Sequence, residues 1–465
     1  MNSLLEFDID YSLSLNLDIK ILQDYKILPF KNEDLSVIAF TTNNKQDINE
    51  LINLFQKPIK LILVGEKEMS SELQYFDLKR FLYEYAILSL NNMEATNLNP
   101  HIITFMEKLF SFCIIKNVSD IHFEAVDKSV LVRLRIDGEL IQIFRFKIEL
   151  FPLISSVIKY LGNLDISQKR IPLNGRFSKE IDGSVYDMRI STMPTIYGES
   201  IVLRILDNGN IKKDINTIGF DKGTLFTIKK TLQLSQGLVL VTGPTGSGKT
   251  TSLYSMIHSL NTKNKKIITI EDPVEYKLDG VMQVNINNEI NLDYQTVLKN
   301  VLRQDPDILL IGEIRDREAL QIAIQASLTG HLVIATLHTN SALETITRLL
   351  DLKAESYLIA STLKMVLSQR LVRKLCIKCK EKNKLKNSYI SKGCIECSYS
   401  GYKDRQIVCE VLEIDEEISN MISQDNSMVN LKSYIQKRKF LTLQDNAMIL
   451  VNNGKTTLEE YYNKV

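Results

Sequence analysis

The sequence contains no apolar run of the length that a bilayer requires. A membrane-spanning helix needs about 20 apolar residues, whereas the longest apolar stretches, such as 61–64 and 238–241, are far shorter and predict buried strands. The N-terminus carries acids and no early basic residue ahead of an apolar run, so it lacks the layout of a secretory signal peptide. We therefore expect a cytoplasmic protein without a transmembrane helix.

A large charge of one sign is also lacking. The 57 basic and 56 acidic side chains leave a net charge of +1, so the chain as a whole offers no electrostatic attraction to nucleic acid or anionic lipid. Hydrophobic residues make up 44% and charged residues 24% of the sequence, which excludes the disordered and fibrous classes. No internal repeat is present, and the length of 465 residues is typical of two or three domains.

Changes in hydrophobic period indicate where the domains begin and end. Residues 1–98 carry no pattern that points to chemistry. A helix at about 102–116 leads into segments with a period of two, such as 131–136, which predict half-buried strands. Asp137-Gly138 predicts a hairpin turn after them.

The second half of the chain changes to an alternation of strands and helices. The period of two returns at 187–190 and 201–205, and turn formers at 207–210 then break it. Apolar strand candidates follow at 238–242, 267–270, 308–311 and 332–336, separated by helical patterns. This alternation is typical of a parallel α/β sheet. We predict an N-terminal region at 1–98, an α+β domain at 99–206, a linker at 207–218 and an α/β domain at 219–465.

A glycine-rich segment directly follows the strand predicted at 238–242. It fits the phosphate-binding pattern GxxxxGK[ST] and consists of Gly243, Pro244, Thr245, Gly246, Ser247, Gly248, Lys249 and Thr250. Glycines let backbone N–H groups curl around phosphate oxygens, and the following helix adds its positive N-terminal end. A glycine-rich turn without a ligand is the alternative, but the strand before and the helix after favour a nucleotide site.

The last residues of this segment have predicted roles in binding ATP and Mg²⁺. Lys249 would reach the β- and γ-phosphates and is predicted to be catalytic, and the hydroxyl of Thr250 can coordinate Mg²⁺. Thr251 continues into the helix that carries the loop. We therefore predict 243–251 as nucleotide-binding residues.

Carboxylates follow two of the predicted strands. They are Glu271, Asp272 and Glu275 after 267–270, and Glu313 at the end of 308–311. Ligands bind at the carboxyl edge of open α/β sheets, and an acid at the end of such a strand commonly holds Mg²⁺. In the structural alternative, these acids cap helices or pair with Arg315 and Arg317.

Two histidines, His331 and His338, flank the strand predicted at 332–336. Both cannot lie beside the same phosphate. We therefore expect one of them to serve a subunit interface or an outer shell of the site, and we predict that His338 senses the γ-phosphate and is catalytic.

Four of the six cysteines form two CxxC pairs, which are Cys376 with Cys379 and Cys394 with Cys397. Tetrahedral zinc is commonly bound by four thiolates supplied in this way. In a reducing compartment the spacing favours metal over disulfides. A redox role for one pair is the alternative, but two pairs without a thioredoxin-like pattern favour a structural Zn²⁺ site at 376–397.

Together these blocks resemble the type II secretion and type IV pilus assembly ATPases, the GspE/PilB family, whose members include some that serve natural transformation. The resemblance covers roughly residues 100–465 and includes the segment 119–124, SDIHFE, which is similar to the family's SDIHxE segment. It implies a RecA-like P-loop motor domain of α/β class with a preceding α+β domain, a small zinc-ribbon insertion and an N-terminal docking region.

The resemblance also implies roles for individual residues. The α+β domain of that family packs over the nucleotide and supplies arginines, which map here to Arg176, Arg189 and Arg204. Glu313 would be the acid near Mg²⁺ and Glu275 the acid that orients water, and the alternative exchanges these two roles.

For function, the resemblance implies a homo-hexameric motor that hydrolyses ATP to assemble a type II secretion, type IV pilus or natural-transformation pseudopilus. It would lie at the inner membrane through a platform protein and a docking protein. The zinc motif is typical of the assembly branch rather than of retraction. The alternatives are a nucleotide-regulated scaffold with little turnover and a DNA-translocating ATPase. The near-neutral charge disfavours the latter, so we expect no direct contact with nucleic acid.

Overall fold

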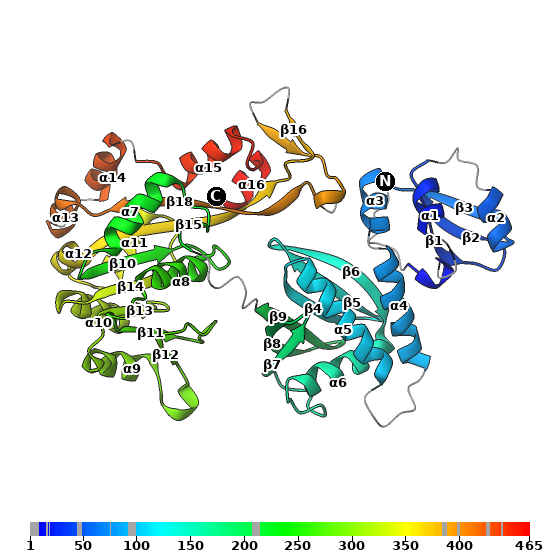
Figure 1. Cartoon of the computed structure of the whole chain (residues 1–465), viewed down its shortest axis with the longest axis horizontal. Coiled ribbons are helices and arrows are strands. Elements are labelled where there is room, and N and C mark those ends of the chain that lie inside the picture. The colour runs from blue at the N-terminus through cyan, green and yellow to red at the C-terminus, as the bar shows by residue number, and fades with distance from the viewer. Residues whose placement is uncertain are drawn as a thin grey trace. The chain divides into compact units, whose positions relative to one another are not determined.

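The structure is a computed structural model in which the chain forms two compact units (Figure 1). The first comprises Met1–Asn208, Cys376–Cys379 and Lys392–Tyr402, and the second comprises Gly209–Leu375, Lys380–Ser391 and Lys403–Val465. The residues described are 9–14, 17, 19–43, 49–74, 76–91, 99–206, 214–383, 388–397, 400–424, 428–438 and 440–465. Within these ranges no helix is both long and apolar enough to cross a bilayer.

The predicted domain boundaries fall partly outside these ranges. Residues 207–213 of the predicted linker lie outside the described residues, as do 1–8 and 92–98 of the predicted N-terminal region. The boundaries therefore stay predictions.

A small sheet lies in the N-terminal part of the first unit, in the order β1-β2-β3. The elements here are η2 (Tyr11–Ser14), α1 (Ile19–Tyr25), β1 (Ile27–Asn32), β2 (Val37–Thr41), α2 (Asn49–Phe55), β3 (Ile59–Leu63), α3 (Glu66–Gln74) and α4 (Phe76–Asn91). The stretch 61–64, which we expected to be buried, begins in the edge strand β3, where Leu63 is 39% exposed. An edge strand is covered less completely than a central one, so this expectation is wrong except at Val64, which is buried.

A larger antiparallel sheet follows, in the order β6-β5-β4-β9-β8-β7. Its elements are α5 (Pro100–Ile115), β4 (Val118–Val126), β5 (Ser129–Ile136), β6 (Glu139–Lys147), η3 (Ile148–Leu150), α6 (Phe151–Leu161), β7 (Leu173–Ile181), β8 (Ser184–Thr195) and β9 (Gly198–Leu206). Alternate residues of β5 are buried, as the period of two predicts. Asp137 and Gly138 have φ values of 49° and 89°, which confirms the predicted turn.

The helix predicted at 102–116 is α5, which begins slightly earlier than expected. Asn99 precedes it and accepts a hydrogen bond from the backbone N–H of His101, and Pro100 occupies the first helical position. Both are helix-start signals, because the cap satisfies a free N–H group and proline has none to lose.

One hydrophobic core extends through the first unit. The ring of Tyr11 meets that of Phe144 edge-on with centroids 6.3 Å apart, and Tyr83 on α4 lies 5.9 Å from Phe146 on β6. The N-terminal segments therefore pack against the larger sheet through aromatic side chains.

The second unit is built on a sheet in the order β12-β11-β13-β14-β10-β15-β18, whose neighbours from β12 to β15 are parallel (Figure 1). Its elements are α7 (Lys222–Leu232), β10 (Gly237–Thr242), α8 (Lys249–Leu260), β11 (Ile267–Glu271), β12 (Met282–Asn285), η5 (Asn288–Ile290), α9 (Tyr294–Val301), η6 (Leu302–Gln304), β13 (Ile308–Ile311), α10 (Arg317–Leu328), β14 (Leu332–Leu337), α11 (Ala342–Asp351), α12 (Ser356–Thr362), β15 (Leu363–Leu375), β18 (Tyr402–Glu413), α13 (Glu416–Ser423), α14 (Met428–Lys437), α15 (Leu443–Asn452) and α16 (Leu458–Lys464). Between β15 and β18 lie the hairpin β16 (Lys380–Lys382) and β17 (Tyr389–Ser391) and the turn η7 (Ile395–Cys397).

Apolar side chains pack on both faces of this sheet. Leu240 of β10 belongs to one apolar cluster together with Leu320 of α10, and Val241 belongs to another together with Leu253 of α8. Parallel strands that are buried on both faces have nearly continuous apolar sequences. The strands predicted at 238–242, 267–270, 308–311 and 332–336 are all confirmed. Their nearly continuous apolar sequences made them recognisable.

A buried ion pair joins α6 to β9 in the first unit. Lys159, whose side chain is 0% exposed, donates from Nζ to Glu199 Oε1 at 2.6 Å and to the carbonyl oxygen of Gln168 at 2.6 Å. Ser155 Oγ donates to the second carboxylate oxygen at 3.2 Å. The pair therefore fixes the base of the loop between α6 and β7.

We predict that Lys159→Met lowers the free energy of unfolding by about 3–5 kcal/mol, because it leaves the carboxylate of Glu199 buried without its charged partner. Urea denaturation followed by circular dichroism measures this, since the chain has no tryptophan. The double variant Lys159→Met/Glu199→Gln should recover much of the loss. A single variant as stable as the wild type would contradict the prediction.

Candidate functional site

The predicted phosphate-binding loop lies between the carboxyl end of β10 and the first turn of α8. Gly243 follows the strand with a φ of 145°, a conformation that favours glycine. A Cβ atom here would lie 2.5 Å from the carbonyl oxygen of Gln369 on β15, so no larger residue fits. The helix begins at Lys249 and presents its free N–H groups to this loop.

The loop offers polar groups that a nucleotide can use. Its exposed members are Pro244, Thr245, Gly246, Thr250 and Thr251. The hydroxyl oxygens of Ser247 and Thr242 are buried and have no hydrogen-bond partner among the described residues. Buried polar groups are usually satisfied, so the loop fits a ligand with hydrogen-bonding oxygens, as ATP with Mg²⁺ has.

The side chain of Lys249 lies over this loop. Its Nζ donates to the carbonyl oxygens of Gly243 at 2.7 Å and Pro244 at 3.0 Å. Burial lowers the pKa of Lys249 to about 8, while the negative charge of Glu313 opposes this shift and the positive charge of Arg370 adds to it. Lys249 and Glu313 are therefore close enough to interact electrostatically.

Charged side chains meet at the carboxyl edge of β11, β13 and β14. Glu313 Oε2 accepts from Arg315 Nε at 2.7 Å, and its Oε1 lies 3.3 Å from His338 Nε2. Asp272 Oδ2 is 3.6 Å from Arg315 Nη1. The pairing of Glu313 with Arg315, raised as the structural alternative, is present. Glu313 contacts His338 as well as Arg315. The predicted γ-phosphate sensor and the predicted Mg²⁺ acid therefore lie together.

The other two predicted acids differ in their surroundings. Glu271 is 5% exposed, and its carboxylate accepts from the hydroxyls of Tyr254 and Thr269 and from the amide of Gln283. It is therefore engaged within the protein. Glu275 lies half-buried in the loop after β11, and its role in orienting water stays a prediction.

His331 lies at the other end of β14 from His338. Its Nδ1 is 2.9 Å from the carbonyl oxygen of Ala326 and 3.2 Å from the hydroxyl of Thr329, near the end of α10. The two histidines thus occupy opposite edges of the sheet, and His331 contacts the end of this helix.

Two residues of β15 were missed in the sequence, Gln369, which contacts the loop and α8, and Arg370, which contacts Asn340 after β14. Gln369 accepts from Ser252 Oγ on α8 at 2.8 Å and donates to the carbonyl oxygen of Ser247 at 2.8 Å. Arg370, whose pKa burial lowers, donates to the carbonyl oxygen of Asn340 at 3.0 Å. The available signal was Ser-Gln-Arg within an otherwise mostly apolar strand, because polar residues buried there need partners.

The predicted arginines lie in the first unit, in one row across the larger sheet. Arg135 is paired in register with Asp120, Asp120 with Arg204, Arg204 with Arg189, and Arg189 with Arg176. Residues paired in this way project from the same face. Arg204 Nε donates to Asp120 Oδ1 at 3.0 Å. The row combines four guanidinium groups with one carboxylate and is a basic surface; contact with a nucleotide stays a prediction.

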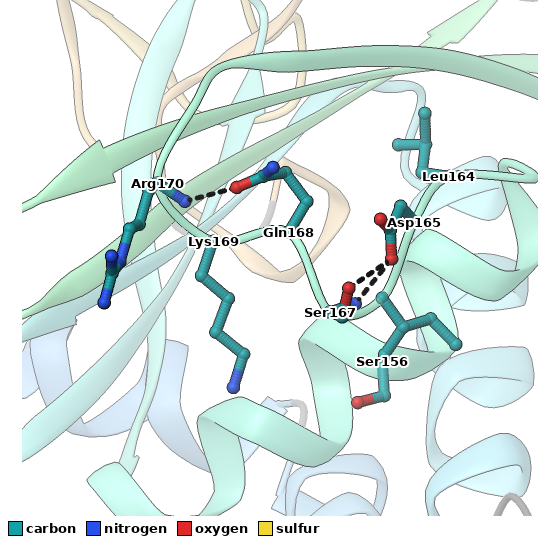
Figure 2. A pocket seen from close by; sticks show the side chains of 8 residues that line it. Ser156, Leu164, Asp165, Ser167, Gln168, Lys169 and Arg170 are labelled. Carbon is teal, nitrogen blue, oxygen red and sulfur yellow. Dashed lines mark hydrogen bonds between the residues drawn. The ribbon is translucent and has the colours of Figure 1, made fainter.

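A pocket lies beside the loop between α6 and β7 of the same unit (Figure 2). It is lined by Ser156, Leu164, Asp165, Ile166, Ser167, Gln168, Lys169 and Arg170. The loop is held internally, because Asp165 accepts from the N–H and hydroxyl of Ser167 at 2.9 and 2.7 Å. These hydrogen bonds lower the pKa of Asp165. The lining includes none of the predicted site residues.

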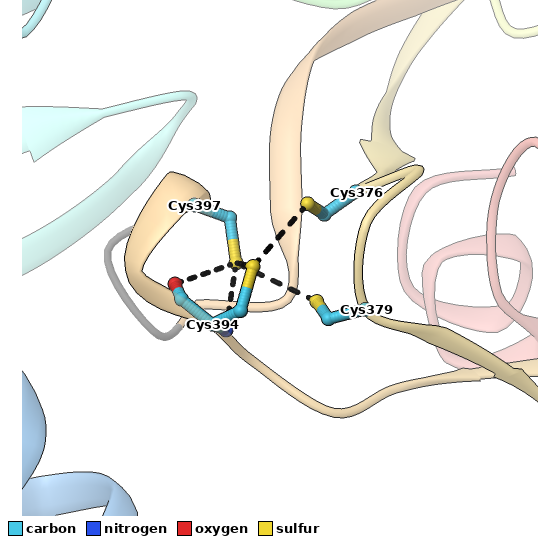
Figure 3. A group of neighbouring side chains, drawn as sticks. All are labelled: Cys376, Cys379, Cys394 and Cys397. Carbon is cyan, nitrogen blue, oxygen red and sulfur yellow. Dashed lines mark hydrogen bonds between the residues drawn. The ribbon is translucent and has the colours of Figure 1, made fainter.

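The four predicted zinc ligands come together in one cluster (Figure 3). The Sγ atoms of Cys376 and Cys394 are 3.8 Å apart, those of Cys379 and Cys397 are 3.7 Å apart, and those of Cys394 and Cys397 are 3.8 Å apart. Four sulfurs bound at about 2.3 Å to one tetrahedral Zn²⁺ lie about 3.8 Å from one another. A disulfide needs about 2.05 Å. The residues therefore fit Zn²⁺, and the redox alternative is not supported.

Backbone groups around the cluster favour thiolates. Burial raises the pKa of the Cys397 thiol, but hydrogen bonds from the backbone N–H groups of Cys394 and Gly401 outweigh it and leave that pKa lowered. Burial raises the pKa of Cys379 to about 12. A metal ion that binds thiolates must therefore displace protons here, above all from Cys379.

Comparison with known proteins identifies the family. A family model described as type II/IV secretion system protein matches residues 94–463. The chain belongs to this family. It is 39% identical over 372 residues to type II secretion system protein E of Dickeya dadantii, covering 77% of this chain and 74% of that protein. It is 35% identical over 495 aligned positions to the type IV pilus assembly ATPase PilB of Acinetobacter baylyi, covering 98% and 84%.

The solved structures agree with this assignment. The chain matches the crystal structure of the pilus retraction motor PilT, which has ADP bound, with a TM-score of 0.55 and 27% identity, over 77% of this chain and 95% of that one. As a member of the secretion family, the chain is an ATPase of the secretion and pilus type, and the predicted fold class is confirmed.

We predict that nucleotide affinity falls as the pH rises through about 8. Phosphate attracts the charged form of Lys249, whose charged fraction drops from about nine-tenths at pH 7 to about one-tenth at pH 9 for a pKa of about 8. The dissociation constant of a fluorescent ADP analogue should therefore rise about tenfold. Lys249→Arg stays charged over this pH range, so it is the control, and its dissociation constant should not change with pH in this way. An affinity independent of pH between 7 and 9 would contradict the prediction.

We predict that the purified chain contains about one Zn²⁺ per molecule and that Cys394→Ser loses it, because a structural zinc needs all four ligands. Elemental analysis measures the metal content. Cys409→Ser is the matched control, since Cys409 is a buried cysteine outside the cluster. Retention of a full complement of zinc by Cys394→Ser would show that the cluster is not the metal site.

Proposed function

We propose that this ATPase works as a homo-hexamer and powers assembly of a secretion or pilus filament at the inner membrane. The observation that carries the proposal is the meeting of Glu313 and His338 at 3.3 Å, close to Lys249, at the carboxyl edge of a P-loop sheet. This arrangement supports the proposal that one site holds the groups that would bind phosphate and those that would act on its γ-phosphoryl end. The names of the relatives, secretion protein E and pilus assembly ATPase, support the filament as the cargo.

In the proposed reaction, Lys249 holds the β- and γ-phosphates and Thr250 would coordinate Mg²⁺ with Glu313 nearby. Bound Mg²⁺ supplies neutralisation of the charge that develops on the transferred phosphoryl group. Glu275 orients the attacking water, and His338 senses whether the γ-phosphate is present. The alternative assignment exchanges the roles of Glu275 and Glu313.

The arginine row supports a ring. Arg176, Arg189 and Arg204 would contact the nucleotide that a neighbouring subunit holds, where guanidinium groups neutralise phosphate charge. Hydrolysis in one subunit would then change the contacts of the next. Such coupling between neighbouring subunits supports the proposed hexamer.

The proposed place of the motor is the cytoplasmic side of the inner membrane. A platform protein and a docking protein would hold it there, with residues 1–98 as the docking region. The filament is a secretion pseudopilus, a pilus or a natural-transformation pseudopilus, since all use motors of this kind. Zn²⁺ held by the four cysteines supports assembly rather than retraction. No direct contact with nucleic acid is proposed, because the net charge is only +1.

We predict steady-state ATP turnover by the purified chain with Mg²⁺. Lys249→Ala should lose both binding and turnover, whereas Glu313→Gln should keep nucleotide binding and lose at least about 100-fold in turnover. Glu318→Gln, an exposed glutamate on α10, is the matched control and should turn over normally.

The competing function is a nucleotide-regulated scaffold with little turnover. The same experiment decides between the two. An inactive wild type, even with phospholipid and the platform protein present, would contradict the motor and favour the scaffold.

A further inference from the structure

We infer that Tyr254 is a positioning residue for ATP hydrolysis, whose hydroxyl ties the loop that carries Glu275 to the nucleotide-binding helix α8. The inference rests on the proposed function, because it assigns Tyr254 a place in the same reaction. Tyr254 itself is not expected to touch the nucleotide.

The first link joins α8 to the end of β11. Tyr254 lies about one and a half helical turns after Lys249 and is 3% exposed. Its hydroxyl donates to Oε2 of Glu271, the last residue of β11. The helix that begins at the phosphate-binding loop is thereby joined to the strand that leads into the acidic loop.

The carboxylate of Glu271 is a fixed anchor. Its Oε1 accepts from Thr269 Oγ1 at 2.6 Å and from Gln283 Nε2 at 3.2 Å. Both oxygens are therefore engaged by neighbouring side chains, and the group is 5% exposed. A carboxylate held in this way is suited to fixing its neighbours rather than to acting on a water molecule.

The same network holds the loop that follows β11. Gln283 Nε2 also donates to the carbonyl oxygen of Tyr276 at 2.8 Å, and its Oε1 accepts from the N–H of Leu278 at 2.6 Å. On the other side of Glu275, the N–H of Val274 donates to Asn285 Oδ1 at 2.8 Å. Glu275 therefore lies between two anchored residues.

Tyr254 also contacts this loop directly. Its ring meets the ring of Tyr276 edge-on, with centroids 6.0 Å apart. Burial and the charge of Glu271 raise the pKa of Tyr254, whereas the backbone N–H groups of Tyr276 and Glu275 act in the opposite direction. The hydroxyl thus lies where Glu271 and the backbone of the acidic loop meet.

Through these contacts, the position of Glu275 is fixed relative to the residues that would bind the phosphates. The loop is connected through Tyr254 to α8, whose first turn carries Lys249 and Thr250. Reaction rates are sensitive to such placement, and a displacement of about 1 Å can cost about 100-fold. A side chain that orients water needs a support of this kind.

Tyr254→Phe separates this role from simple packing, because it keeps the ring and removes only the hydroxyl. In the full chain with MgATP we expect kcat to fall about tenfold, while nucleotide affinity stays within about twofold because the phosphate-binding loop is intact. Tyr11→Phe is the matched control. It removes a buried tyrosine hydroxyl from Glu72 in the first unit, and it should leave kcat unchanged.

A double-mutant cycle with Glu275→Gln tests whether Tyr254 acts through Glu275. If it does, Tyr254→Phe/Glu275→Gln is no slower than Glu275→Gln alone, because residues that act as a unit are not additive. Losses that multiply in full would overturn the inference, as would a wild-type kcat in Tyr254→Phe. Equal losses of kcat and nucleotide affinity in that variant would show a purely structural role and also overturn it.

The failure of the inference can be told from the failure of the proposed function. A wild-type chain without turnover overturns both. A wild-type chain that hydrolyses ATP while Tyr254→Phe matches it overturns the inference alone.

Discussion

The position of the phosphate-binding loop depends on how closely β10 approaches β15. Gly243 leaves the strand at a point where a Cβ atom would lie 2.5 Å from the carbonyl oxygen of Gln369. The amide of Gln369 then holds the loop at Ser247 and the helix at Ser252, both at 2.8 Å. Because α8 starts from this loop, the approach of Gly243 to Gln369 also sets the direction of the helix. The positions of the side chains that α8 carries depend on that direction. A rigid site on a parallel sheet needs such support from a neighbouring strand.

The sequence predicted the parts of the molecule that local patterns encode. The phosphate-binding loop, the central strands and the cysteine pairs have their signals within a few consecutive residues, so they were found. The contacts of Gln369 and Arg370 were not found, because they depend on β15 lying beside β10 although the two are far apart in the chain. The link between Tyr254 and Glu271 escaped for the same reason, since it joins α8 to the end of β11. The stretch 61–64 was placed in a core although much of it belongs to an edge strand, because an apolar run does not reveal how many neighbours its strand has.

The arginine row shows how register creates a surface that no single segment contains. Its members come from β5, β4, β9, β8 and β7, and they meet only because the strands pair as they do. Like charges directly opposite one another destabilise a sheet, and Asp120 is the carboxylate that is paired in register with Arg135 and Arg204. The register of the strands thereby gathers four guanidinium groups and one carboxylate on one face of the sheet.

The cysteine cluster has a consequence for how the chain tolerates change. Its ligands lie just after β15 ends at Leu375 and just before β18 begins at Tyr402, so an ion bound there closes the intervening segment into a loop. The entropic cost of closing a loop grows only slowly with its length. With its two ends clipped together, the segment between Lys380 and Ser391 can lengthen or shorten while the strands on either side keep their places. A change in the length of this hairpin therefore need not move the strands of the sheet.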